Sequence, residues 1–225
     1  MGALQKQPYL SEKEYLLLEQ TSDIKHEFID GELYAMAGVG TNHNRITATL
    51  TRHFGNHLDG KPCEVFASDM KLKVQHEFFY PDVMVICHQS EIQNGYSEDA
   101  LIIVEVLSKS TRRTDQTIKR LRYQGLANLQ EYVLIEPKFV DVEICRRKNH
   151  WQSERYYMGD EVYFAAIDLT LTAEQIYARV INEDTVNDYE EQEPTTHRIR
   201  YDIDEYKRRF GYRAFRAGHR GRMRR

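Results

Sequence analysis

The stretch that decides the fold is ALIIVEVLSKS, residues 100–110. Apart from Glu105, residues 101–107 are apolar, which predicts a strand buried on both faces in a sheet covered by helices. A second stretch, YPDVMVICH at 80–88, places Asp82 behind a proline at the start of an apolar run. An ionised carboxylate is costly to bury without a partner or a metal ion, so both acids need a structural or functional reason.

Outward from these two strands, the pattern alternates between helices and strands. Ser11 and Glu14 form a capping-box signature, Asp30-Gly31 is a favoured hairpin turn, and Thr172 suits the start of a last helix. A Thr/Asn cap is expected to begin the long central helix. Helices are predicted at 11–20, 38–60, 114–126 and 171–180, and strands in a hairpin at 25–38 and at 63–74, 80–88, 100–107, 131–137, 139–147, 150–159 and 161–167.

The charge distribution separates the chain into two parts. Residues 206–225 carry nine Lys or Arg and no acid, whereas the first 205 residues carry 22 basic and 35 acidic side chains. We predict one domain at 1–182, then a linker, a short amphipathic helix near 201–212 and a basic tail within 183–225. An acidic body does not bind nucleic acid by bulk charge, so any contact needs a local site, a metal ion or the tail.

Composition also indicates the cellular compartment of the protein. The chain has no run of 18 apolar residues, and its N-terminus lacks the layout of a secretory signal, which predicts a cytoplasmic protein with no membrane contact. Cys63, Cys87 and Cys145 are widely spaced and form no C-x-x-C motif. We therefore expect three reduced cysteines and no structural zinc.

Asp82 and Glu105 are the first candidates for chemistry. If their strands are neighbours, both carboxylates reach one end of the sheet, where their repulsion would recruit a hard cation such as Mg²⁺. The following helix offers a basic group, because Asp115, Lys119 and Arg122 recur at spacings of four and three on one face. The alternative is a structural ion pair between Glu105 and a nearby Lys or Arg.

These residues resemble a known family. The pattern YPD…IIVEVLSKST…K is similar to the PD-(D/E)xK nuclease superfamily and, within it, to the Uma2 family. The resemblance covers about residues 9–180. Its segments occur in one order: EFIDGELYAMAG, NHNRI, PCEVFASDMKLKV, FFYPDVMVI, IIVEVLSKSTRRTD, YQGLANLQEYVLIEP and LTLTAEQIY.

The resemblance implies a restriction endonuclease-like fold of the α/β (α+β) class. Its mixed central sheet is flanked by helices, with an N-terminal hairpin and extra C-terminal strands. The resemblance assigns Asp82 and Glu105 as ligands of Mg²⁺ or Mn²⁺ and adds Glu27 and Lys119 to the catalytic set. The superfamily's lysine, two residues after the acid, is replaced here by Leu107, and Lys119 is the residue that matches it.

Four further residues are candidates for binding nucleic acid. His43 and Arg45 match the Uma2 pattern at the start of the central helix, Lys71 lies on the strand beside the expected cleft, and Arg122 shares the face of Lys119. The leading hypothesis is a metal-dependent endonuclease that hydrolyses DNA phosphodiester bonds. A second is a nuclease fold that binds nucleic acid or a protein partner without cleavage, and a third is an assembly protein. A homodimer is expected.

Overall fold

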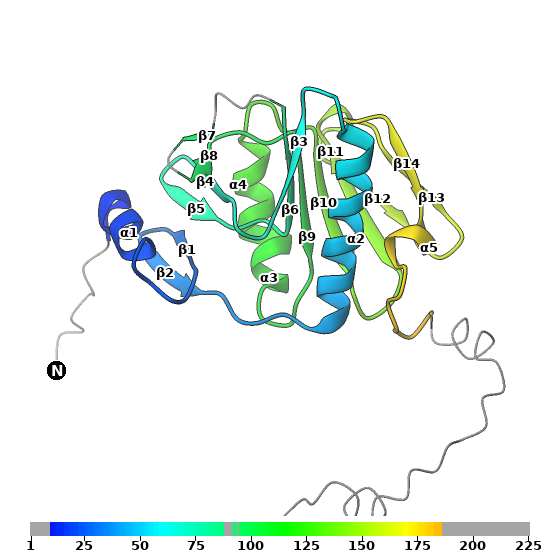
Figure 1. Cartoon of the computed structure of the whole chain (residues 1–225), viewed down its shortest axis with the longest axis horizontal. Coiled ribbons are helices and arrows are strands. Elements are labelled where there is room, and N and C mark those ends of the chain that lie inside the picture. The colour runs from blue at the N-terminus through cyan, green and yellow to red at the C-terminus, as the bar shows by residue number, and fades with distance from the viewer. Residues whose placement is uncertain (1–9, 88–91, 94, 186–225) are drawn as a thin grey trace, which may run out of the picture. The chain divides into compact units, whose positions relative to one another are not determined.

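The centre of the protein is a six-stranded mixed sheet in the order β12-β11-β10-β9-β6-β3, shown in Figure 1. The computed structural model describes residues 10–87, 92–93 and 95–185. The strands of this sheet are β3 (Glu64–Ala67), β6 (Val83–Ile86), β9 (Ile102–Val106), β10 (Glu131–Glu136), β11 (Asp141–Arg146) and β12 (Ser153–Tyr156). β9 and β10 are parallel and the other neighbours are antiparallel. This arrangement confirms the predicted fold class.

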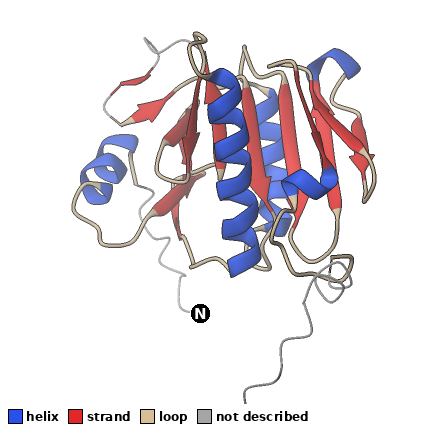
Figure 2. Ribbon diagram, turned by 45° about the vertical axis from the view of Figure 1, so that its right-hand side comes forward, coloured by secondary structure: helices blue, strands red, loops and turns tan. Residues whose placement is uncertain are grey.

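Helices cover both faces of this sheet, as Figure 2 shows for the long helix α2 (Thr41–Leu58) in front of the strands. The crossover between β9 and β10 runs through α3 (Arg112–Thr114), a π-helical turn η2 (Asp115–Lys119) and α4 (Arg120–Gln124). Side chains alternate between the two faces. Val83, Val85, Ile102 and Val104 pack with Ile46, Leu50 and Phe54 of α2, whereas Met84, Ile86 and Ile103 pack with Tyr123 of α4.

A second sheet, in the order β2-β1-β5-β4-β8-β7, contains the predicted N-terminal hairpin. Its strands are β1 (His26–Ile29), β2 (Glu32–Ala35), β4 (Lys71–Val74), β5 (Glu77–Phe79), β7 (Ile92–Gln93) and β8 (Tyr96–Ser97). The turn is confirmed, with φ of 49° at Asp30 and 82° at Gly31. The capping box that begins α1 (Glu12–Glu19) is confirmed too. Tyr15 of α1 packs on Phe28 and Phe78 and anchors this helix.

Two predicted elements are wrong in their extent. The segment 63–74 is not one strand, because the backbone turns at Ser68, where φ is 55°, and β3 and β4 join different sheets. The expected cap of α2 is also wrong: Gly40 is the N-cap, and Thr41 and Asn42 lie within the helix. The side chain of Asn42 binds the backbone of Ile181.

The C-terminal part of the domain differs from its prediction as well. The strand expected at 161–167 is β13 (Glu161–Phe164), which pairs antiparallel with β14 (Leu169–Thr172) in a separate hairpin. The final helix α5 is only Ala173–Ile176, although its capping box at Thr172 is confirmed. The sequence around Thr172 predicted the capping box of α5 but not strand β14, which precedes this helix. Beyond Thr185, the predicted linker, short helix and basic tail lie outside the described residues.

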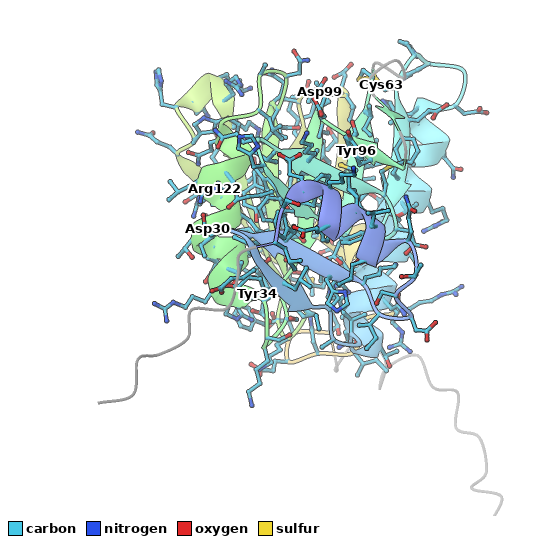
Figure 3. The ribbon with its side chains drawn as sticks, turned by 90° about the vertical axis from the view of Figure 1, so that its left-hand side faces the viewer. Asp30, Tyr34, Cys63, Tyr96, Asp99 and Arg122 are labelled. Carbon is cyan, nitrogen blue, oxygen red and sulfur yellow. A yellow bond between two sulfur atoms is a disulfide. The ribbon has the colours of Figure 1, made fainter. Side chains whose placement is uncertain are left out.

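The prediction of reduced cysteines is wrong for two of the three. Cys63 and Cys87 form a disulfide near the upper edge of the view in Figure 3, and Cys145 is free and buried. Glu64 pairs with Ile86 across β3 and β6, so the next residues outward lie opposite each other, close enough to bond. Sequence spacing does not show this proximity. In the described residues, no helix is long and apolar enough to cross a membrane.

Candidate active site

Asp82 and Glu105 come from neighbouring antiparallel strands. Val83 pairs with Val104 across β6 and β9, so the next step in the register sets Asp82 opposite Glu105. Residues opposite each other in an antiparallel pair point to the same face of the sheet. Oδ2 of Asp82 accepts a hydrogen bond of 2.7 Å from the backbone N–H of Val106. The two acids therefore lie side by side at one end of the sheet.

Lys119 joins these acids from the crossover helix. Its Nζ lies 2.7 Å from Oε1 of Glu27 and 3.1 Å from Oε1 of Glu105. Oδ1 of Asp115, one turn earlier in η2, is also 3.1 Å away. Lys119 is 2% exposed. One ammonium group, almost completely removed from solvent, is thus enclosed by three carboxylates from three different segments of the chain.

Burial and charge act in opposite directions on this group. Burial alone would lower the pKa of Lys119, but the carboxylates of Glu105, Glu27 and Asp115 outweigh it and hold that pKa well above its ordinary value. Burial raises the pKa of Glu105 well above its ordinary value, against the opposing effect of Lys119 and with support from the neighbouring acids. Lys119 is therefore a permanent cation in an environment with excess negative charge.

Other contacts fix the orientation of the acids. The phenol of Tyr123 donates a hydrogen bond of 3.0 Å to Oε1 of Glu105. The backbone N–H of Tyr80 donates to Oε1 of Glu27 at 3.2 Å. These two hydrogen bonds come from the folded chain itself and restrain the orientation of both carboxylates.

His43, at the start of α2, holds the remaining acid. Its Nε2 lies 3.1 Å from Oδ2 of Asp82. The ring is buried, and its other nitrogen, Nδ1, has no hydrogen-bond partner among the described residues. Nε2 faces the carboxylate of Asp82, so Nδ1 is the ring nitrogen left without a partner among the described residues. His43 therefore orients Asp82 through one nitrogen and keeps the other unused.

A cavity of about 160 Å³ opens onto the cluster. Glu27, His43, Asp82, Glu105 and Lys119 all line it.

The rim of this cavity is partly apolar and comes from β2 and the loop after it. Tyr34 pairs with Glu27 across the hairpin, so both point to the cavity side. Tyr34 is labelled in Figure 3, and Met36 and Val39 complete this rim. All three side chains are exposed. Sequence reasoning missed them, although the hairpin register, once known, identifies Tyr34.

The other predicted nucleic-acid contacts lie away from the cavity lining. Arg122 forms ion pairs with Glu77 and Asp30, and Figure 3 shows it beside Asp30. Lys71 lies over the ring of Tyr80 at 5.5 Å from its centroid. For Arg45, the side-chain contact is a hydrogen bond of 3.4 Å to Asn42. Of the four candidates, only His43 touches the acidic cluster.

The structure shows where Leu107 lies, the residue at the position of the superfamily's lysine. Leu107 is buried in the core cluster that contains Tyr123 of α4. Lys119 instead reaches Glu105 from the helix above. The structure also brings Asp115 into the cluster, a role that sequence reasoning did not assign to it. Its position four residues before Lys119 was the available signal.

The carboxylate oxygens of Asp82 and Glu105 provide part of the coordination that a hard cation needs. Oδ1 of Asp82 and Oε2 of Glu105 accept no hydrogen bond from the described residues, and both side chains line the cavity. Two free carboxylate oxygens are ligands of the type that Mg²⁺ prefers, with water completing its coordination. Within the described part of the chain, no group of three or more His, Cys, Asp or Glu forms a ready metal cluster. The fit thus rests on two protein ligands.

The sheet order, with helices on both faces and acids meeting at the ends of two central strands, defines a protein of the restriction endonuclease-like class. A family model described as "Uma2: Putative restriction endonuclease" matches residues 12–174. The chain belongs to the Uma2 family.

Individual relatives agree with this assignment. The uncharacterized protein slr1290 of Synechocystis is 34% identical over 175 residues, which cover 76% of this chain and 92% of that protein. A second uncharacterized Synechocystis protein, sll1609, is 37% identical over 149 residues, covering 64% and 80%. The crystal structure of a "putative nuclease belonging to DUF820" from Anabaena variabilis superposes with a TM-score of 0.64 at 17% identity, covering 75% of this chain and 98% of that one. That likeness shows the shared fold.

Proposed function

We propose that this protein is a metal-dependent endonuclease that hydrolyses phosphodiester bonds of DNA. The observation that carries the proposal is one charged cluster: Glu27, Glu105 and Asp115 surround Lys119, and His43 contacts Asp82. All of these residues except Asp115 line one cavity. Four carboxylates and one permanent cation leave a buried excess of negative charge, which the fold alone has no reason to keep. Membership of the Uma2 family supports the same reaction.

Asp82 and Glu105 are the residues that would hold Mg²⁺ or Mn²⁺. Each has a carboxylate oxygen free of hydrogen bonds to described residues, and each is restrained through its other oxygen. When bound, the ion supplies Lewis-acid stabilisation of the phosphate and activates water. Restraint matters because a ligand that is already oriented loses little conformational freedom when the ion binds.

Lys119 is the proposed stabiliser of charge at the scissile phosphate. Its pKa is raised by the carboxylates around it, so it stays protonated and places a positive charge beside a phosphate oxygen that gains negative charge in the transition state. Glu27 and Asp115 position this ammonium group from two sides. A preorganised cation in a site of restricted water access acts more strongly than one in solvent.

Nicking of supercoiled plasmid in Mg²⁺, Mn²⁺ or EDTA tests the proposal. We expect cleavage by the wild type that requires the metal ion, and its loss in Asp82→Asn and Glu105→Gln. Asp30→Asn is the matched control, because it makes the same chemical change in an exposed turn and keeps a residue that tolerates the left-handed conformation. Calorimetric titration with Mn²⁺ reports ion binding independently of cleavage. Wild-type protein inactive in both metals, or Asp82→Asn with full activity, would refute the proposal.

A second candidate is a nuclease fold that binds nucleic acid or a protein partner without cleaving. Leu107 in the lysine position, and the contacts of Lys119 and His43 with the acids, favour it. Binding of DNA without nicking in either metal would establish this function instead. The expected homodimer remains a prediction, which sedimentation velocity of the full-length chain tests. A monomer mass across the working concentration range would exclude it.

A further inference from the structure

The cavity that holds the charged cluster also has an uncharged wall, which begins at Tyr34. Glu27 of β1 and Tyr34 of β2 are directly opposed in the hairpin register. Opposed residues of an antiparallel pair point to one face of the sheet, with their Cβ atoms about 5 Å apart. Both residues line the cavity, and Glu27 is the acid closest to the ammonium group of Lys119. A group held at the charged end therefore has the tyrosine as a neighbour.

Tyr34 is an exposed aromatic side chain whose hydroxyl is restrained. The residue is 49% exposed, and its phenol donates a hydrogen bond of 3.1 Å to Oε2 of Glu32 on the same strand. Within the described part of the chain, no aromatic ring or cation stacks on it. An exposed ring that is held at its polar end and lacks a stacking partner is the kind of surface on which a nucleobase stacks.

The residues that follow Tyr34 extend this uncharged surface. The backbone N–H of Met36 donates to the carbonyl of Lys25, so the hairpin ladder continues and alternation places Met36 on the same face as Tyr34. Met36 and Val39 line the cavity and are exposed. A methionine side chain is flexible and polarizable, and it packs well against aromatic rings. This wall of the cavity therefore suits a flat, uncharged group rather than a phosphate.

Hydroxyl side chains form a third part of the cavity lining. Ser108, Ser110, Thr111 and Thr114, from the segment after β9, all line it. A hydroxyl both donates and accepts hydrogen bonds, as the sugar and the polar edges of a base require. The cavity thus offers charged groups, an aromatic and apolar surface, and hydroxyls within about 160 Å³. These three kinds of contact match the phosphate, the base face and the polar edges of one nucleotide.

The net charge of the domain gives stacking a particular value. The first 205 residues carry 22 basic and 35 acidic side chains, so they do not attract a phosphate backbone over long range. Stacking of a base on an aromatic ring adds affinity that does not depend on charge. In a duplex, neighbouring bases cover both faces of each base, so a base must leave the stack before it can contact such a ring.

We propose that Tyr34 is a stacking platform for an unpaired nucleobase next to the scissile phosphate. The inference rests on the proposed function and adds the substrate class: DNA that is single-stranded or locally unpaired at the cleavage point. The phosphate lies at Lys119 and the acids, while the adjacent base stacks on Tyr34 between Met36 and Val39. Fully paired DNA binds more weakly, because one of its bases must first be unstacked and unpaired.

Three variants of the full-length chain test the platform. Tyr34→Leu keeps an apolar side chain but removes the flat ring, whereas Tyr34→Phe keeps the ring and removes the hydroxyl. Tyr163→Leu is the matched control. Tyr163 lies on strand β13, is 41% exposed and donates a hydrogen bond of 2.8 Å from its phenol to Asp168, but it is not part of the cavity lining. It reports any general cost of replacing an exposed tyrosine in a strand.

The measurement is titration of oligonucleotides that carry 2-aminopurine, a base whose fluorescence is quenched by stacking, in EDTA and in Ca²⁺ at several salt concentrations. We expect wild type to bind the single strand more tightly than the duplex and to quench it. Tyr34→Leu should bind the single strand about tenfold more weakly, with an unchanged salt slope because no charge is lost. Tyr34→Phe and Tyr163→Leu should behave like wild type.

Several results would overturn the platform: equal affinity of wild type and Tyr34→Leu, equal losses on single strand and duplex, or no binding by the wild type in either condition. Two further outcomes separate it from the reaction. If Tyr34→Leu loses the quenching and wild type cleaves no DNA in Mg²⁺ or Mn²⁺, the platform stands and the nuclease proposal fails. If wild type and Tyr34→Leu cleave single-stranded and duplex DNA in the same ratio of rates, the nuclease stands and the platform fails.

Discussion

Replacing Lys119 with methionine should leave three carboxylates without the cation that they surround. Methionine keeps a similar length and removes the charge, so most of the loss is electrostatic. The Nζ of Lys119 lies within 3.1 Å of Glu27, Glu105 and Asp115, and the residue is 2% exposed. Removal of one partner from a buried ion pair costs about 3–5 kcal/mol. We expect Lys119→Met to lower the free energy of unfolding by about that amount at neutral pH.

The loss of stability caused by Lys119→Met should grow as the pH rises. Burial already raises the pKa of Glu105 above its ordinary value of 4.5, and Lys119 is the group that opposes this. Without it, the folded chain binds more protons than the unfolded chain above that ordinary value. The free energy of unfolding then falls with increasing pH until the raised pKa is passed. The variant should therefore be closest to wild type in mild acid.

Urea unfolding in EDTA, followed by circular dichroism, measures this effect at several pH values. Lys148→Met is the control: Lys148 is exposed and forms no ion pair among the described residues, so its loss should change stability by less than about 0.5 kcal/mol. Adding Glu105→Gln to Lys119→Met should recover about 1 kcal/mol or more. A loss below about 1 kcal/mol for Lys119→Met, or a deficit that does not vary with pH, would refute the electrostatic account.

Three further predictions concern stability. Replacing Cys63 and Cys87 with alanine removes a disulfide that spans 24 positions of sequence and should lower the free energy of unfolding by about 3 kcal/mol. Dithiothreitol should destabilise the wild type equally. Unchanged stability in both experiments would contradict the prediction. Gly31→Ala forces a side chain into a conformation with φ of 82° and should cost about 1–2 kcal/mol, seen as a lower Tm in calorimetry. Ser11→Ala removes the cap of α1 and should cost about 1 kcal/mol, whereas Ser11→Asp should retain stability in the same urea assay.

Local patterns predicted the features that depend on neighbours in sequence. The turn at Asp30 and Gly31 follows from the few residues that accept positive φ, and the capping boxes at Ser11 and Thr172 follow from side chains reaching three residues along the chain. The apolar runs of β6 and β9 identified the central strands because only strands buried on both faces lack alternation. The acids within those runs then stood out as candidates for a site.

Other features depend on which segments meet in space. The break at Ser68 sends β3 and β4 into different sheets, and the pairing of β3 with β6 makes the disulfide. The sequence of a strand does not specify which strand it pairs with. Neither the separation of β3 from β4 nor the disulfide could therefore be predicted from local sequence. The same reason explains why the helix predicted at 171–180 includes the last two residues of β14.

The sequence by itself predicted the fold class and the family and singled out Asp82 and Glu105 as candidate site residues, because periodicity and the order of motifs can be read without coordinates. Only the tertiary structure decided that Lys119 meets Glu27 and Asp115 as well as Glu105, that Leu107 is buried, and that His43 meets Asp82. Those facts depend on how a crossover helix, a hairpin and a helix start approach one end of a sheet. Distances between side chains from separate elements are set by packing, which no single stretch of sequence specifies.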